Sequence, residues 1–594
     1  MRSTDQTSDT QQRVFRAILI LSMLAVFLRA NSLGHEPLAA LVSADTDDIM
    51  RFLSVRNWIA GQGWYDMVQA GVVADGGLLL HWSRLVDAGI AAIIWPLSFA
   101  LPVAQAEAAG VVLWPILLLG VLLYVTATQS LRHFGPMAAT GTVLCFLMWP
   151  AVAFSFAPTR IDHHNVQIFL LTIVILALLR ADNGWRSGAV AGMATALSLA
   201  VGLETGPSLG LAGILLSLMT LTRPMHFSNA LIGYGATLGP AAVTFFALQT
   251  SPETWQVARC DQLGYPLLRV IGAASSAAVA FGFLLQSARA TASRTVLFVM
   301  LYGAALALAL PTLASCSGGP YGDLPPVVQE TIYAQIKEAK PALLVAKSSP
   351  LAFHSNAVPL FIGLTLASLI AFFDRDVARR NRVILLLVFG GMAALATLHQ
   401  MRMLVSGVAV LPLIAGYILG WLMEWRQHQK YRAMAGILAI FAGMVTIIYP
   451  KVAAYALNTR TEAEKTYTEK REISTYSQCR TDEVLKPLAN LPRGAVLSTM
   501  NLGPSILLSS GQPILAAPYH RSAAAMVNGL LFISQNDAES FHAAVREIGA
   551  VYVVLCENEI QYGFASKLSR GEHVPGLTLV PGFDPSLVVY RVLP

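Results

Sequence analysis

The sequence predicts a polytopic, all-helical membrane bundle of about thirteen transmembrane helices, followed by a small external α/β domain. The 594 residues are 55% hydrophobic and only 12% charged, with a mean hydropathy of +0.58. Soluble globular proteins carry about 25% charged residues. Apolar runs of about 17–23 residues recur along the chain, the length that a membrane span requires. This composition excludes a cytosolic enzyme, a disordered chain and a nucleic-acid binder.

The elements follow in order from these apolar runs. The amino-terminal residues are basic and then apolar, without a small-residue cleavage site, which favours a retained anchor helix over a signal peptide. The predicted spans are 14–30, 107–129, 137–157, 165–181, 188–204, 206–222, 228–248, 265–287, 295–313, 353–373, 383–399, 403–423 and 433–450.

One further apolar run, 88–103, decides the topology of everything after it. Basic residues should gather in cytoplasmic loops, and the Arg- and Lys-bearing loops all fall on one side only if this run does not cross. The run is also short and contains Pro96. We therefore expect an external re-entrant or interfacial helix, a cytoplasmic amino terminus and an external carboxyl terminus.

This topology predicts two domains. Residues 1–450 form the transmembrane domain, with long external loops at 31–106 and 314–352. Residues 451–594 are less apolar, and runs such as GAVYVVLC and LTLVPG predict strands mixed with helices in an external α/β domain.

The first external loop opens on three acids, Asp45, Asp47 and Asp48. Acidic residues favour a helix amino terminus, so these residues are consistent with a solvated helix start. A carboxylate at the membrane surface is also suited to act as a general base or a metal ligand. Sequence alone leaves both interpretations open.

A second cluster, Asp162-His163-His164, lies directly between two predicted spans. Charged residues in such a position are costly and tend to be functional. Carboxylate and imidazole together suit a divalent ion such as Mn²⁺ or Mg²⁺, although pairing with Arg160 is an alternative. Glu204, at the end of another span, requires a partner or a water-lined cavity.

Four other residues face outside in the predicted topology. Glu338 lies in the second long loop, and Arg402 lies at the external mouth of a span. Arg402 suits a lipid phosphate or serves as an interfacial anchor. Cys260 and Cys316 flank the helix pair 265–313 and could form a disulfide in an oxidising compartment.

In this order, the features resemble the catalytic subunit of oligosaccharyltransferase, within the C-type (GT-C) class of membrane glycosyltransferases. DTDDIMR gives Asp45 and Arg51 at the family's six-residue spacing, and His81-Trp82 is similar to its HW dipeptide. Asp162-His163-His164 resembles the archaeal DHH motif. Glu338 followed by Pro341, and then Arg402, resemble the loop glutamate and the phosphate-contacting arginine.

The resemblance implies roles for these residues. Asp45, Asp162 and His164 would hold a divalent metal, Mg²⁺ or Mn²⁺. Asp45, Asp47 or Asp48 would act in catalysis together with Glu338, and Arg402 would bind the donor phosphate.

The resemblance fails at one motif. Where the family carries Trp-Trp-Asp-Tyr-Gly, which reads the hydroxyl of the acceptor sequon, this chain has Thr499, Met500, Asn501, Leu502 and Gly503. Only the glycine is shared, so this site should not select Asn-X-Ser/Thr in that way.

Acceptor or donor contacts are then expected from other residues. The candidates are His81, Trp82, Glu204, His520 and Arg521.

The resulting hypothesis is a membrane glycosyltransferase that uses a polyprenyl phosphate or diphosphate sugar donor, embedded among membrane lipids. Its acceptor would be a glycan, lipid or protein, and nucleic acid is not a partner. The basic inner loops and few cysteines suit a bacterial inner membrane with a periplasmic C-terminal domain. Alternatives are an oligosaccharyltransferase acting on protein Asn, a polyprenyl-glycan transporter or flippase, and an inactive scaffold.

Overall fold

The structure is a computed structural model, and it describes residues 36–286, 290–322, 324–335, 337–428 and 478–594, with residues 13, 16, 19, 20, 23 and 24. Most of the predicted span 14–30, all of 433–450 and the predicted domain boundary near residue 450 lie outside the described residues.

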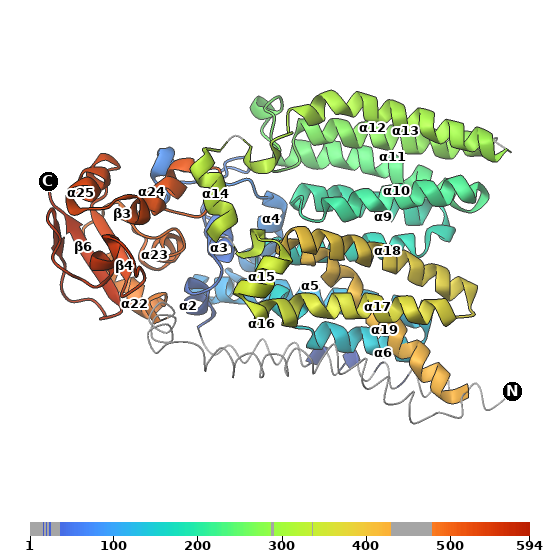
Figure 1. Cartoon of the computed structure of the whole chain (residues 1–594), viewed down its shortest axis with the longest axis horizontal. Coiled ribbons are helices and arrows are strands. Elements are labelled where there is room, and N and C mark those ends of the chain that lie inside the picture. The colour runs from blue at the N-terminus through green and yellow to red at the C-terminus, as the bar shows by residue number, and fades with distance from the viewer. Residues whose placement is uncertain are drawn as a thin grey trace.

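A bundle of long helices forms most of the molecule, and a smaller lobe lies at one end of it (Figure 1). Seven described helices are long and apolar enough to cross a membrane. The bundle helices are α5 (Val103–Phe134), α6 (Pro136–Met148), α7 (Pro150–Ser155), α8 (His164–Leu178), α9 (Trp185–Val201), α10 (Gly206–Thr222), α11 (Pro224–Gln249), α12 (Tyr265–Leu285), α13 (Thr291–Ala314), α17 (Val358–Phe373), α18 (Val377–His399) and α19 (Leu404–His428).

The helices follow the predicted spans with two differences. The run 137–157 is broken into α6 and α7, because Trp149 precedes Pro150 and is extended (φ −76°, ψ 122°), the conformation that a following proline favours. Helices α8, α9 and α10 have only 15, 17 and 17 residues. The count of thirteen spans is therefore not confirmed.

Close packing of α9 on α11 depends on glycine. A Cβ added at Gly188 would collide with the backbone carbonyl of Ala230, and one at Gly233 would collide with the carbonyl of Trp185. Small residues let membrane helices approach in this way. The pair lies in the part of the bundle opposite α17 and α19 (Figure 1).

The first long loop folds between the bundle and the lobe (Figure 1). It forms α2 (Pro37–Val42), α3 (Thr46–Ile59), the antiparallel strands β1 (Val68–Gln69) and β2 (Leu78–Leu79), and α4 (Arg84–Leu97). Helix α4 covers most of the run 88–103 and begins earlier, where the Ser83 hydroxyl caps it by accepting from the amide of Leu85. Its 14 residues extend about 21 Å, less than the roughly 30 Å of a bilayer core.

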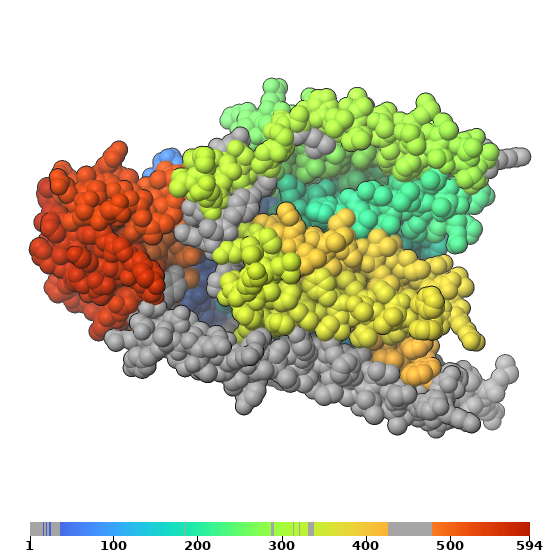
Figure 2. Space-filling model, in the orientation of Figure 1, coloured from blue at the N-terminus to red at the C-terminus, as the bar shows by residue number. Residues whose placement is uncertain are grey.

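The second long loop forms α14 (Pro326–Gln335), α15 (Ala342–Ser348) and the single turn α16 (Pro350–Ala352). In the space-filling view this yellow-green segment lies between the red lobe and the bundle (Figure 2).

The smaller lobe consists of the described C-terminal residues 478–594. It contains a four-stranded mixed sheet in the order β3-β4-β6-β5, with β3 parallel to β4 and the other pairs antiparallel. The central strand β4 is buried at every residue, because cores form on both faces of the sheet. The strands are β3 (Val496–Leu497), β4 (Tyr552–Cys556), β5 (Leu577–Leu579) and β6 (Leu587–Val592), and the helices are α22 (Asp482–Leu485), α23 (Gly503–Ser510), α24 (Ala523–Ser534), α25 (Ala538–Glu547) and α26 (Ala565–Ser569).

The lobe shares one of these cores with the first loop, since side chains of α3 and of the segment around β2 pack among those of the sheet. Backbone pairing strengthens the contact: Val73 donates to the carbonyl of Ile514 at 2.9 Å, and Ile514 donates to that of Gly71 at 2.8 Å. The Tyr519 hydroxyl donates to the carbonyl of Thr46 at 2.8 Å. The start of α3 is thus held by the lobe.

A buried ionic network fixes α3 against α4. The Asp87 carboxylate accepts from Arg51 at 2.8 Å, from Arg84 at 3.1 Å and from the Ser54 hydroxyl at 2.8 Å. Arg51 and Asp87 are fully buried. Arg51, at the predicted six-residue spacing from Asp45, therefore anchors the helix that carries the acids.

Asp87→Ala is expected to lower the free energy of unfolding by about 3–5 kcal/mol, because it leaves two buried guanidinium groups without their carboxylate. Denaturant titration of the detergent-solubilised protein measures this. Glu253→Ala, an exposed acid outside the network, serves as the control. A loss for Asp87→Ala no larger than that of the control would contradict the proposed role of the network.

Candidate active site at the end of the bundle

The three acids of the first loop have different environments. Asp45 caps α3 by accepting from the amide of Asp47 at 3.2 Å, and its half-exposed carboxylate lies 3.2 Å from Arg160. Asp48 is fully buried and accepts from Arg160 at 2.7 Å and from the amides of Ile161 and Asp162 at 2.8 and 2.9 Å. Burial, offset in part by Arg160, raises the pKa of Asp48 to about 7. Asp48 therefore holds the loop that carries Asp162.

Asp47 is the acid without such a structural task. Within the described part of the chain its carboxylate has no hydrogen-bond or ion-pair partner. Burial, and then the negative charges of Asp162 and Asp45, raise its pKa well above its usual range. A cation among these carboxylates would relieve their repulsion.

Asp162 lies at the centre of a chain of polar contacts. One of its oxygens contacts Nδ1 of His163 at 2.5 Å, and the other forms a short hydrogen bond with Nδ1 of His164. On its other side, Nε2 of His163 lies 3.2 Å from Glu204, which also accepts from Gln167 at 2.6 Å. Glu204 thus has the partner that its position requires.

In this series of polar contacts, the positive charge of His163 lies between the negative charges of Asp162 and Glu204. Burial opposes the positive charge on His163, but Asp162 and Glu204 outweigh it and raise its pKa to about 10. Burial also opposes ionisation of Glu204, yet His163 holds the pKa of Glu204 well below its usual range. Both ring nitrogens of His163 face carboxylates, so this residue positions Asp162, while the partly exposed His164 faces the adjacent cavity.

That cavity has a volume of about 530 Å³ and opens beside the cluster. Its walls are mostly apolar and come from α7, α15 and α19. Its charged lining residues, together with His164, are Arg160, Asp162, Glu338 and Arg402, and its other polar lining residues are Asn165, Asn356, Ser155 and Ser349.

Arg402 places a positive charge at this cavity, and not all of its hydrogen-bond donors have partners in the described part of the chain. Its guanidinium lies 3.4 Å from Glu338 and 3.5 Å from the Tyr321 hydroxyl. Its Nε–H is buried and has no hydrogen-bond partner among the described residues. The structure therefore brings Glu338, Arg402 and the Asp162 cluster to one cavity, although they are far apart in sequence.

The residues present fit a divalent ion. One possible ligand atom from each of Asp162, His163 and His164 lies within 4.8 Å of the others. Both nitrogens of His163 face carboxylates, so Asp162 and His164 are the ligands that this group offers. Asp47 is a further carboxylate, whose charge interacts with that of Asp162. Carboxylate oxygen with imidazole nitrogen is a donor set that binds Mn²⁺, Mg²⁺ or Zn²⁺.

His81 and Trp82, although neighbours in sequence, contact different groups of residues in the structure. Trp82 is buried, with the guanidinium of Arg51 4.7 Å from its ring centroid and the Tyr519 ring 5.6 Å away. His81 instead faces His520, with ring centroids 4.6 Å apart.

Asp261 joins this second group. It accepts from His520 at 2.9 Å, and Arg521 donates to both of its oxygens at 2.7 Å. These bonds outweigh burial and hold the pKa of Asp261 well below its usual range. Burial, with the positive charges of His520 and Arg521, lowers the pKa of His81.

The cysteines form two disulfides. Cys260 is joined to Cys316, and Cys479 is joined to Cys556. Only the first of these pairs is predicted from the sequence. Cys145 is free and buried in the bundle.

The segment Thr499–Gly503 lies in the lobe, where Thr499, Met500 and Asn501 line a separate cavity of about 700 Å³. The Thr499 hydroxyl donates to Glu559 at 2.5 Å. Burial raises the pKa of Glu559, offset in part by that bond.

From the sequence, Arg160 is expected only as an alternative partner of the Asp162 cluster, and no role is assigned to His163 or Asp261. In the structure Arg160 pairs with Asp45 and Asp48. His163 is the central residue of the DHH motif, and that motif was the available signal. Asp261 carried no signal beyond its place beside Cys260, since its partners are distant in sequence.

Comparison with known proteins shows the fold. No family model and no curated protein matches the sequence. The archaeal oligosaccharyltransferase AglB from Archaeoglobus fulgidus, in complex with an inhibitory peptide and a dolichol-phosphate, superposes with a TM-score of 0.63 and 12% identity, over 92% of this chain and 70% of that chain. The Archaeoglobus fulgidus oligosaccharyltransferase in complex with Zn and sulfate superposes with a TM-score of 0.58 and 14% identity, over 91% of this chain and 68% of that chain. The predicted fold class, a GT-C-type helical membrane bundle with a small C-terminal sheet domain, is confirmed.

Proposed function

We propose that this protein is an integral-membrane glycosyltransferase that transfers a sugar or oligosaccharide from a polyprenyl phosphate or diphosphate to an acceptor outside the membrane. The observation that carries the proposal is the cavity beside Asp162, which joins a cluster of acids, histidines and arginines to an apolar wall formed by bundle helices. An amphiphile with an anionic head matches such a cavity.

Arg402 is proposed to bind the donor phosphate. A guanidinium forms strong, charge-assisted hydrogen bonds to phosphate, and the buried Nε–H of Arg402 has no partner in the described structure. The apolar residues along α19, including Leu404 and Val408, would contact the lipid. The dolichol-phosphate bound to the structurally similar enzyme is a ligand of this class.

Asp47, Asp162 and His164 are proposed to hold the divalent ion, Mg²⁺ or Mn²⁺. When bound, such an ion offsets negative charge on the phosphate. Asp47 replaces the predicted Asp45 in this set, because Asp45 is used as a helix cap and a partner of Arg160. The structurally similar enzyme was solved with Zn and sulfate, a divalent metal with a phosphate-like anion.

The reaction itself is a substitution at the anomeric carbon of the sugar. The acceptor oxygen forms a bond to that carbon, and the bond from the carbon to the phosphate oxygen breaks. The lipid phosphate leaves with the electron pair of that bond, and an acidic side chain of the first loop accepts the acceptor's proton. Glu338, 3.4 Å from Arg402, would orient the acceptor and the guanidinium.

The acceptor is proposed to differ from the Asn-X-Ser/Thr sequon. Thr499, Met500 and Asn501 supply neither indole rings nor a carboxylate at the position of Trp-Trp-Asp. A hydroxyl of a glycan, lipid or protein is therefore the proposed acceptor.

The site is proposed to face the periplasm of a bacterial inner membrane. Cys479 and Cys556 belong to the C-terminal lobe, and the Cys260–Cys316 disulfide lies next to Asp261, which binds His520 and Arg521 of that lobe. Disulfides persist in oxidising compartments. Labelling of engineered surface cysteines in intact cells would test this orientation.

Reconstitution tests the proposed function. The purified protein in liposomes, supplied with a polyprenyl-linked sugar and Mn²⁺, should release the free lipid phosphate and form a glycosylated acceptor detectable by mass spectrometry. Mass analysis of envelope glycans with and without the gene would identify that acceptor.

Three results would contradict the proposal in different ways. Glycan on the Asn of a sequon peptide indicates an oligosaccharyltransferase, whereas substrate movement without product indicates a transporter. Absence of both product and divalent-metal binding indicates an inactive scaffold.

Substitution of the first-loop acids distinguishes their roles. Asp47→Asn is expected to lower the transfer rate at least about 100-fold, as loss of an electrostatic catalytic group does. Asp45→Asn should lower it less than about tenfold, since asparagine is also a good helix cap. The two variants are matched in chemistry, and equal rates for both would contradict the assignment of Asp47.

A further inference from the structure

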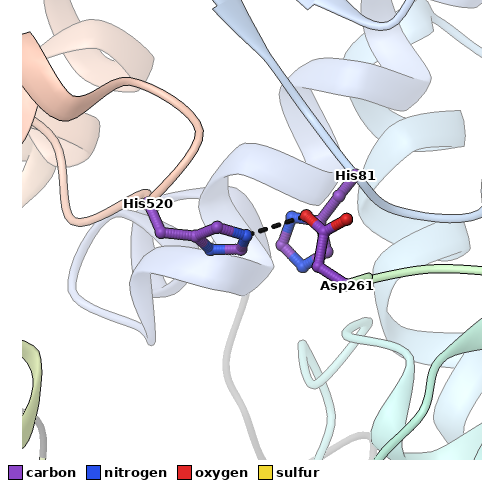
Figure 3. Close-up of side chains that lie close together, drawn as sticks. All are labelled: His81, Asp261 and His520. Atoms are coloured by element: carbon purple, nitrogen blue, oxygen red, sulfur yellow. Dashed lines mark hydrogen bonds and ion pairs between the residues drawn. The ribbon is translucent and has the colours of Figure 1, made fainter. Parts of the chain in front are cut away.

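Outside the candidate active site, three parts of the chain meet at one polar cluster (Figure 3). His81 follows β2 in the first loop, Asp261 lies between α11 and α12 beside the Cys260 disulfide, and His520 belongs to the C-terminal lobe. One possible ligand atom from each lies within 4.8 Å of the others. We propose that these three side chains form a zinc site that links the lobe to the membrane domain.

Their chemistry is that of a zinc site. Two imidazoles and one carboxylate are a common protein ligand set for Zn²⁺, with one position left for water. Tetrahedral ligands at normal zinc distances are about 3.3 Å apart. Nε2 of His520 and Oδ2 of Asp261 are already 2.9 Å apart, so small side-chain rotations bring the third ligand into range.

The ion pairs of Asp261 with Arg521 and His520 do not account for the position of His81 in this cluster. Asp261 is already paired with Arg521 through two hydrogen bonds of 2.7 Å. His81 is half-buried and faces His520, yet no hydrogen bond to its ring occurs among the described residues. In Figure 3 the dashed line joins His520 to Asp261. A neutral imidazole directed at another imidazole and a carboxylate is arranged as a ligand.

Arg521 and the ion can share Asp261. A carboxylate accepts at about four lone-pair positions, and here Arg521 uses two and His520 uses one. Zinc would replace the hydrogen between His520 and Asp261, and binding would release a proton when His520 carries one. The ion would thereby fix the loop next to Cys260, the first loop and the lobe relative to one another.

Zinc content of the purified full-length protein tests the site. The protein is stripped with a chelator, re-equilibrated with Zn²⁺, and its bound zinc is measured by plasma mass spectrometry. His520→Ala removes one ligand and leaves the Asp261–Arg521 pair intact, so we expect one zinc fewer per chain than in the wild type. His573→Ala, an exposed histidine of the same lobe, should retain the wild-type content.

The candidate active site can also bind zinc, so the two sites are separated by a second variant. Asp162→Ala should lose the zinc ion bound at the candidate active site and keep the zinc ion whose binding depends on His520. Equal zinc in the wild type and His520→Ala would overturn the proposal, whatever the transfer activity.

A second pair of variants keeps the test valid if His520→Ala does not fold. His81→Gln should weaken zinc binding at this site more than about 100-fold, beyond the usual effect of changing a residue behind a ligand. Arg521→Gln retains all three ligands and removes a competing cation, so it should bind zinc at least as tightly as the wild type. Weaker binding in Arg521→Gln than in His81→Gln would overturn the proposal.

Discussion

Asp162→Ala is expected to abolish sugar transfer, with a rate loss of at least about 1000-fold. A bound divalent ion supplies several kcal/mol of transition-state stabilisation, and each 1.36 kcal/mol is tenfold in rate. The variant loses the carboxylate that contacts both His163 and His164. The measurement is the initial rate of product formation in liposomes at saturating donor and Mn²⁺.

The backbone of the loop should survive this change. Asp48 accepts from the amides of Ile161 and Asp162, and a residue's amide is unchanged by substitution of its side chain. We therefore expect Asp162→Ala to insert in the membrane and to elute from a sizing column like the control Glu253→Ala. Full transfer activity in the variant would refute the proposed metal site.

Arg402→Ala is expected to lower kcat/KM for the lipid-linked donor roughly 100-fold. A hydrogen bond to a charged group contributes about 1.5–3 kcal/mol, and Arg402, whose Nε–H is buried, lines the cavity that we propose for the donor. Initial rates over a range of donor concentrations give this value directly.

Arg402→Lys separates charge from shape. Lysine keeps the positive charge but lacks the planar fork of donors that matches phosphate, so we expect an intermediate loss of about tenfold. Arg493→Ala, an exposed arginine of the lobe, is the control. A lysine variant as active as the wild type would mean that only charge is needed, and an unaffected Arg402→Ala would exclude a phosphate contact.

The sequence was sufficient to predict the bundle because hydropathy is a local property. The runs near α5, α11, α12, α18 and α19 could each be identified from their own residues. Helix breaks were harder to predict: Pro150 divides one predicted span, and only the structure shows that Trp149 leaves the helix there.

The candidate site was predictable in composition but not in detail. Spacing in DTDDIMR favoured Asp45, since Arg51 lies six residues later. In the structure Asp45 caps α3, Asp48 binds the neighbouring loop, and Asp47 has neither task. Which of these three neighbouring acids is left without a structural partner depends on a loop more than a hundred residues away, which contains Arg160, Ile161 and Asp162.

Cysteine pairing and the proposed zinc site show the same limit of prediction from sequence. Cys479 and Cys556 are 77 residues apart. Hydropathy separates them from Cys145, which lies in a predicted span, but nothing in their local sequence shows that they pair. His81, Asp261 and His520 come from three segments with no shared motif. These three side chains come together only when the lobe packs on the first loop and on the segment next to Cys260.

The amino-acid sequence is enough to identify a helical membrane protein with acids, histidines and an arginine in the loops of one side. Span length and the placement of charges can be read directly from the order of the residues. Which of those residues lie together became clear only from the folded structure: Asp162 and Glu204 on either side of His163, Arg402 with Glu338, and His81 with Asp261 and His520. The physical reason is that hydropathy acts along the chain, whereas electrostatic repulsion, hydrogen bonding and metal coordination act across distances of a few ångströms that folding sets.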